Sequence, residues 1–150
     1  MIKEFQQLLH KEIPLTQHMG LEIISFDDEK IQVKAPLINN INDKGSVFGG
    51  SSSALMIISA WTLIKLSCNK HKIDADIVIH KNSTTWHKAL YTDLVINAKL
   101  VKAYDFSDVK GKLADKRHQR INCSIELVDK EGVLFATMNA KYVIINQSSQ

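Results

Sequence analysis

The sequence predicts an α+β domain in which a curved antiparallel sheet of about six strands wraps around one long buried helix, with a short N-terminal helix beside it. Residues 47–66 are apolar on nearly every side of a helical wheel, as a buried helix is. Segments with strand patterning precede and follow this helix. Since one helix cannot cover both faces of such a sheet, the sheet should curve around it and a second copy should cover the remainder.

The composition limits the class of protein. The 150 residues fit one domain, residues 1–150, and 45% hydrophobic with 23% charged residues is typical of a globular chain. A net charge of +3 permits an anionic ligand, but Lys and Arg form no track with exposed aromatic residues, so we expect no nucleic-acid partner. Cys68 and Cys123 are too few and too isolated for a disulfide framework or a zinc site.

The location of the protein is predicted from the same features. Two isolated cysteines indicate a reducing compartment, and the N-terminal residues lack the uninterrupted apolar region of a secretory signal. The most apolar stretch, residues 54–64, is shorter than the roughly 20 residues that a membrane-spanning helix needs. We therefore expect a cytoplasmic protein with no membrane partner.

The N-terminal elements follow from residue spacing. Apolar residues in segment 2–13 recur at intervals of three and four, which predicts an amphipathic helix ended by Pro14. Segments 21–26 and 31–35 flank a polar turn and predict a β-hairpin. Segment 37–46 is rich in Asn, Asp and Gly, which predicts a loop.

A stripe of small hydroxyl side chains crosses the predicted central helix at Ser52, Ser59 and Thr62. Such hydroxyls commonly bond back to carbonyls of their own helix. They would also let a strand or a second subunit approach closely. The sequence leaves both interpretations open.

The second half of the chain is dominated by strands. Segment 104–115 has no clear periodicity and contains a glycine, so we expect a loop there. The polar residues 146–150 predict a frayed tail. Four segments alternate between apolar and polar residues as strands do: residues 76–86, 93–101, 117–128 and 133–145.

The order of these elements and three motifs resemble the hotdog fold of acyl thioesterases, most closely the thioesterase family named for the YiiD C-terminal domain. The resemblance covers residues 14–145, and the first motif is followed by an apolar helix that contains Ala60-Trp61. The three motifs are Asn42-x-Lys44-Gly45-x-Val47-Phe48-Gly49-Gly50-Ser51, Ile77-Val78-Ile79-x-Lys81-x-Ser83 and Ala140-x-Tyr142-Val143.

The resemblance implies a catalytic site at the start of the central helix. Amides near Gly49 and Gly50 would stabilise the oxyanion of a thioester, and Asn42 would hold the attacking water or the carbonyl. Ser83, on a strand laid across the site by the partner of a homodimer, would orient water. The alternative explanation for the paired glycines is close packing of helix and sheet.

The implied substrate is an acyl group carried on coenzyme A or acyl carrier protein, within fatty-acid metabolism. Val47 and Phe48 would line its tunnel. Lys81, Arg117 and Arg120 would bind or steer the carrier phosphates, although each is also explained as a solvated surface charge. No cofactor is implied beyond the coenzyme A or phosphopantetheine of the substrate, and no metal. The sequence does not decide between a dimer and a tetramer.

The sequence lacks the residues that usually serve as the general base in better-understood thioesterases. Those enzymes often have a His before the paired glycines and an acid two turns later, where this chain has Phe48 and Ile57. No Asp or Glu occurs between Lys44 and Ile73, so the central helix supplies no general base. The candidate replacements are Ser83, His87, His80 and Asp43; for His87 and Asp43 the alternatives are a solvated histidine and a turn residue.

Two other functions are the alternatives to hydrolysis. A module that binds acyl carriers without hydrolysing them would need no general base. Hydration or dehydration of acyl thioesters would need an acid–histidine pair, and the loop and central helix contain none.

Overall fold

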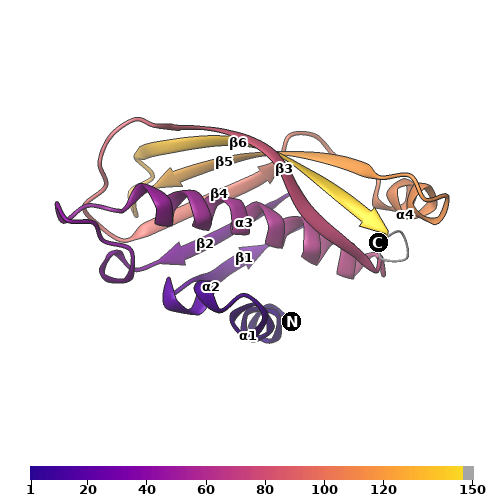
Figure 1. The fold of residues 1–150 in the computed structure, drawn as a ribbon, viewed down its shortest axis with the longest axis horizontal. Coiled ribbons are helices and arrows are strands. Elements are labelled where there is room, and N and C mark those ends of the chain that lie inside the picture. The colour runs from indigo at the N-terminus through magenta and orange to yellow at the C-terminus, as the bar shows by residue number, and fades with distance from the viewer. Residues whose placement is uncertain (147–150) are drawn as a thin grey trace.

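Helix α3 (Gly49–Lys70) packs against a six-stranded antiparallel sheet in the computed structural model, which describes residues 1–146 (Figure 1). The strand order is β1-β2-β4-β5-β6-β3, so β1 and β3 form the edges. The strands are β1 (Glu22–Phe26), β2 (Lys30–Ala35), β3 (Ala75–Trp86), β4 (Leu94–Leu100), β5 (Gln119–Val128) and β6 (Leu134–Asn146). The predicted α+β class and the sheet around one central helix are confirmed. Residues 147–150 of the predicted tail lie outside the described residues.

The N-terminal helix forms as the spacing predicts, and a second one follows it. Helix α1 (Ile2–Glu12) buries Phe5 and Leu9 against the core. Pro14 ends α1 and occupies the first position of α2 (Pro14–His18), where its missing N–H is not needed. A one-turn 3₁₀ helix, η1 (Leu37–Asn39), lies within the predicted loop.

Segment 104–115 is not a loop, because it contains helix α4 (Phe106–Ala114). Asp105 caps this helix, and its Oδ1 accepts hydrogen bonds from the amides of Ser107 and Asp108 at 3.0 and 3.2 Å. The helix buries Phe106, Val109 and Leu113, which share one face. The expectation of a loop was wrong because three apolar residues on a nine-residue helix are too few to show a clear periodicity.

Helix α3 is the buried helix that the sequence predicts. Its stripe of hydroxyl side chains bonds back to the helix: Ser59 Oγ donates to Leu55 O at 2.6 Å and Thr62 Oγ1 to Ile58 O at 2.7 Å. The helix is long and apolar enough to cross a membrane by length and composition alone. Its position against the sheet instead makes it the core helix of this fold.

Both cysteines are free thiols within the core, as predicted. Burial raises the pKa of Cys68 to about 11 and that of Cys123 to about 12, so neither is a thiolate near neutral pH. Tyr142 is buried as well, and its hydroxyl donates to Ile57 O on α3 at 2.6 Å. Burial raises the pKa of Tyr142 far above its ordinary value. These groups therefore stabilise the contact between helix and sheet and supply no nucleophile.

Strand β3 contains a β-bulge. Ile79 pairs with Tyr142, while Lys81 pairs with Lys141, the next residue of β6. His80 is thus one extra residue opposite β6. Since side chains alternate between faces along a strand, one extra residue exchanges the faces of everything after it.

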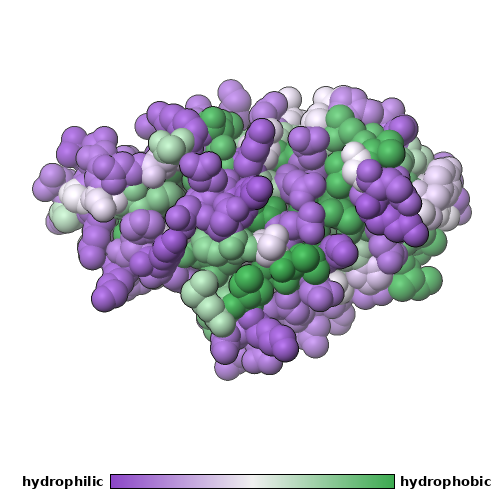
Figure 2. All heavy atoms as spheres, turned by 180° about the vertical axis from the view of Figure 1, so that it is seen from behind, coloured by the Kyte–Doolittle hydropathy of each residue, from purple (hydrophilic) through white to green (hydrophobic). Residues whose placement is uncertain are grey.

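The bulge decides which side chains of β3 lie on the side of α3. Ser83 pairs with Asn139, an exposed residue of β6, and therefore lies on the outer face of the sheet. Three residues pair with buried positions of β6 and so share the helix-facing side: Asn82, Thr84 and Trp86. Figure 2 shows the molecule from behind the view of Figure 1, where hydrophilic side chains cover most of the surface around smaller hydrophobic patches.

Candidate active site

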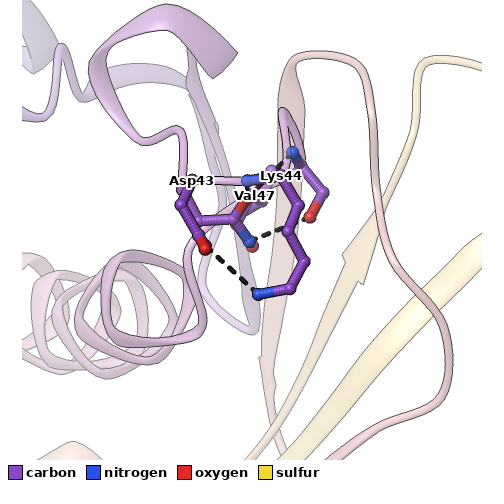
Figure 3. A network of polar contacts seen from close by, with 5 residues as sticks. Asp43, Lys44 and Val47 are labelled. Atoms are coloured by element: carbon purple, nitrogen blue, oxygen red, sulfur yellow. Dashed lines mark hydrogen bonds and ion pairs between the residues drawn. The ribbon is translucent and has the colours of Figure 1, made fainter.

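The loop before α3 is closed by the side chain of Asn42. Its Oδ1 accepts hydrogen bonds from the amides of Lys44 and Ser46 at 2.8 and 3.1 Å, and its Nδ2 donates to Ser46 Oγ at 2.9 Å. At the exposed tip, Lys44 Nζ lies 3.2 Å from the Asp43 carboxylate (Figure 3). Both polar ends of the Asn42 amide are therefore engaged in holding the loop.

Backbone contacts of the same loop fix the direction in which the chain enters α3. Ile41 and Val47 form an isolated antiparallel bridge, and Gly45 makes the turn between them with a φ of +85°. The Val47 amide donates to Leu90 O at 2.9 Å, and the Phe48 amide donates to Asn40 O at 2.8 Å. These bonds hold Phe48 in an extended conformation, so that the helix begins at Gly49.

The N-terminus of α3 has no side-chain cap. The Ser52 amide donates to Phe48 O at 3.0 Å, and among residues 1–146 no acceptor is found for the amides of Gly49, Gly50 or Ser51. Such amides, at the positive end of a 22-residue helix, attract a negatively charged oxygen. This arrangement can stabilise an oxyanion.

The two glycines are not explained by close packing of helix and sheet. A Cβ at Gly49 would make an ordinary contact of 3.8 Å with the Trp86 indole. A Cβ at Gly50 would lie 2.5 Å from the ring of Phe48, which is 55% exposed. Gly50 thus makes room for the Phe48 ring, whereas a side chain at Gly49 would meet no obstruction.

A cavity of about 350 Å³ opens beside this helix N-terminus. It brings together three residues of the sequence-predicted site, Asn42, Val47 and Gly49, whereas Phe48 and Gly50 lie next to it along the chain. The rest of its lining was not predicted and consists of Ser46, Ser52, Trp86, Lys88, Ala89, Leu90 and Leu127.

Trp86 and Lys88 are two of the large side chains that the sequence analysis missed. Trp86 Nε1 donates to Ser52 Oγ at 3.0 Å, and Ser52 Oγ lies within donating distance, 3.0 Å, of Gly49 O. Lys88 Nζ lies 5.0 Å from the centre of the Phe135 ring. The backbone carbonyl of Phe135 accepts hydrogen bonds from the amides of His87 and Lys88. The sequence indicated that Trp86 ends a strand. It could not indicate which face of the sheet the side chain occupies, because that depends on the bulge.

Ser83 is not brought to this cavity. It lies on the outer sheet face in a second, shallow cavity of about 240 Å³ that is also lined by Lys81, Asn139 and Lys141. Arg117 pairs with the exposed carboxylate of Asp115 at 3.6 Å, beyond the end of α4. Arg120 is exposed on β5. The three cations predicted to contact carrier phosphates therefore lie away from the cavity lining.

Among the described residues, those that line the cavity include no Asp, Glu or His, and their only charge is that of Lys88. Of the candidate bases, His87 is exposed with a ring nitrogen 3.0 Å from Thr137 Oγ1, and Asp43 is held by Lys44. His80 is the exposed residue of the bulge. A single copy thus presents amide donors and polar loop groups at this site without a general base.

Comparison with known proteins decides the family. A family model described as "Putative thioesterase (yiiD_Cterm)" matches residues 2–146. The chain belongs to this YiiD C-terminal thioesterase family. Its members' hotdog fold is the fold described above, and the resemblance seen in the sequence is confirmed.

Solved structures of similar fold extend this result. A putative thioesterase from Shewanella oneidensis superimposes with a TM-score of 0.81 at 22% identity, over 96% of each chain. A Chlorobaculum tepidum protein of unknown function gives 0.86 at 23% identity, over 97% of this chain and 94% of the other. A Haemophilus influenzae thioesterase gives 0.78 at 15% identity, over 97% and 91%. At these identities the likeness shows the fold alone.

Proposed function

We propose that this YiiD-type chain hydrolyses acyl thioesters of coenzyme A or acyl carrier protein at the N-terminus of α3. The observation that carries the proposal is that the amides of Gly49, Gly50 and Ser51 have no acceptor among residues 1–146 and lie beside a cavity of about 350 Å³. Membership of a thioesterase family supports the same chemistry.

The proposed reaction needs little from side chains. A water oxygen attacks the thioester carbonyl carbon, and the carbonyl electron pair moves onto the oxygen, where the amides near Gly49 and Gly50 stabilise it. The tetrahedral intermediate then collapses, the C–S bond breaks, and the sulfur leaves with one proton of the water. Asn42 positions the loop in this scheme, while Val47 and Phe48 contact the acyl group. Lys81, Arg117 and Arg120 would steer the anionic carrier at longer range.

A homodimer paired through β3 completes the proposed assembly. Strand β3 is a sheet edge that exposes Val78 and Ile79 to 44% and 38%. Pairing of two β3 strands would continue the sheet and keep Asn82 and Thr84 on its helix side. Thr84 Oγ1 donates to Asn82 Oδ1 at 2.8 Å, so these two side chains form a polar pair that could orient water. Ser83 would stay on the outer face.

Substitutions at neighbouring positions of β3 test which face acts. Thr84→Ala is expected to lower kcat about tenfold, because a misplaced water reacts more slowly. Ser83→Ala is the matched control and should stay within about twofold of wild type, since truncation of an exposed side chain away from the site changes little. Steady-state kinetics measures both, with sedimentation to establish the dimer. A tenfold loss for Ser83→Ala with normal Thr84→Ala would instead assign the role to Ser83, the residue named from the sequence.

A second function has one observation in its favour. Because no carboxylate or imidazole from the described part of the chain lines the cavity, the site would also suit a module that binds acyl carriers without hydrolysing them.

A panel of acyl-CoA substrates of different chain length discriminates between the two functions. For the hydrolase, we expect at least one substrate to be cleaved by wild type about tenfold faster than by Asn42→Ala, whose loop would no longer hold the helix start in place. Thiol release measures the rate, and retention of the acyl-CoA on gel filtration measures binding. Equal rates for wild type and Asn42→Ala, with binding retained, would establish the binding module instead.

A further inference from the structure

Helix α3 runs along strand β3 in the opposite direction. The line of contact between these two elements, here called the seam, begins at Trp86 and Ser52, which also line the cavity. Near the cavity Trp86 bonds to Ser52, and further along Trp61 Nε1 donates to Ile77 O at 2.9 Å. At the far end Lys65 Nζ donates to Ala75 O at 3.0 Å. These three contacts pair the start of α3 with the end of β3 and the second half of α3 with the start of β3.

The flank of α3 beside this seam is apolar. Ala54, Ile57, Ile58 and Trp61 are only partly buried, although each packs against the core. An alkyl chain placed along this flank would bury apolar surface, which is favourable. These four residues lie outside the cavity lining, further along the same helix than Gly49 and Ser52.

Trp86 lies where the cavity meets this seam. Its side chain lines the cavity, faces the helix side of β3 beyond the bulge, and is held to Ser52 by the indole N–H. The indole nitrogen lies 3.8 Å from the Cβ position of Gly49, so the ring stands directly beside the helix start. A chain that extended from the cavity along α3 would have to displace this ring and break its hydrogen bond.

We propose that Trp86 closes the cavity toward the seam between α3 and β3, and thereby restricts the acyl group to short chains. The inference rests on the proposed thioesterase function for its substrate class. Trp86 acts as a specificity residue through its ring, while its N–H bond to Ser52 keeps the ring in the closed position. Removal of the ring opens a path along the apolar flank.

The test compares acetyl-, hexanoyl- and decanoyl-CoA in wild type and two variants of Trp86. Trp86→Ala is expected to raise the ratio of kcat/KM for decanoyl over acetyl substrate at least about tenfold, the scale on which an apolar pocket discriminates between chain lengths. Trp86→Phe retains a ring but loses the N–H bond to Ser52, so its ratio should lie between those of wild type and Trp86→Ala. Tyr91→Ala truncates another exposed aromatic outside the cavity lining and should leave the ratio unchanged.

A binding measurement separates failure of this inference from failure of the proposed function. Non-hydrolysable thioether analogues of the same three acyl-CoAs are titrated by calorimetry into wild type and Trp86→Ala. If neither protein hydrolyses any substrate but Trp86→Ala gains affinity for the decanoyl analogue, the chain is a binding module and the role of Trp86 stands. If wild type hydrolyses or binds the decanoyl compound as well as Trp86→Ala does, or if the variant's ratios are unchanged, the inference is overturned.

Discussion

Replacement of Gly49 by proline is expected to lower kcat for thioester hydrolysis by about 10²-fold or more, the usual cost of one oxyanion donor. Proline removes the amide hydrogen at Gly49 and leaves the rest of the helix start in place. Gly49→Ala retains this hydrogen and should stay within a few fold of wild type. Steady-state kinetics with the best substrate of the acyl-CoA panel measures the difference.

The fold should tolerate both changes. Gly49 is the first residue of α3, the position where proline is accepted because its N–H has no partner within the helix. Phe48 precedes it with ψ of 129°, the extended conformation that proline requires of its neighbour. A Cβ at Gly49 makes only an ordinary contact of 3.8 Å with Trp86. Thermal unfolding of the two variants checks that they are equally folded, and equal kcat values for proline and alanine would remove the Gly49 amide from the mechanism.

Truncation of Leu63 to alanine is expected to destabilise the protein by about 3 kcal/mol, within the usual range for a fully buried leucine. Leu63 is 0% exposed on the helix around which the sheet wraps, so its removal leaves a cavity at the centre of the core. Urea unfolding followed by circular dichroism measures the change in the free energy of unfolding.

Leu8→Ala provides the matched control. Leu8 is 46% exposed on α1, and the same truncation there should cost less than about 1 kcal/mol because little apolar surface is buried. A cost at Leu63 no larger than the cost at Leu8 would mean that α3 is not packed as described.

The elements that the sequence predicted well are those whose patterning is long. Helix α3 has a long apolar stretch, and strands β5 and β6 alternate over ten or more residues. The structure has all three within a few residues of the predicted bounds. Helix α4 was missed because its buried face has only three apolar residues. Its capping residue Asp105 was the available signal.

The candidate site was harder to predict than the fold. The motif around Gly49 predicted where α3 begins, because a glycine pair after a polar loop can be recognised from neighbouring residues alone. Trp86, Lys88, Leu90 and Leu127 reach the cavity from elements far away in sequence, and no local pattern reports such a meeting. The outward position of Ser83 depends on the unpaired His80, and alternation alone cannot reveal an added residue.

The bulge at His80 also affects how related chains are compared and how they can evolve. A relative that lacked one residue at this point would present its counterparts of Ser83 and Thr85 to the helix and turn those of Asn82 and Thr84 to solvent. An alignment without a gap there would match side chains that lie on opposite faces of the sheet. A one-residue deletion in an edge strand could therefore exchange the whole set of β3 side chains that face the helix in a single genetic event, without any substitution in α3.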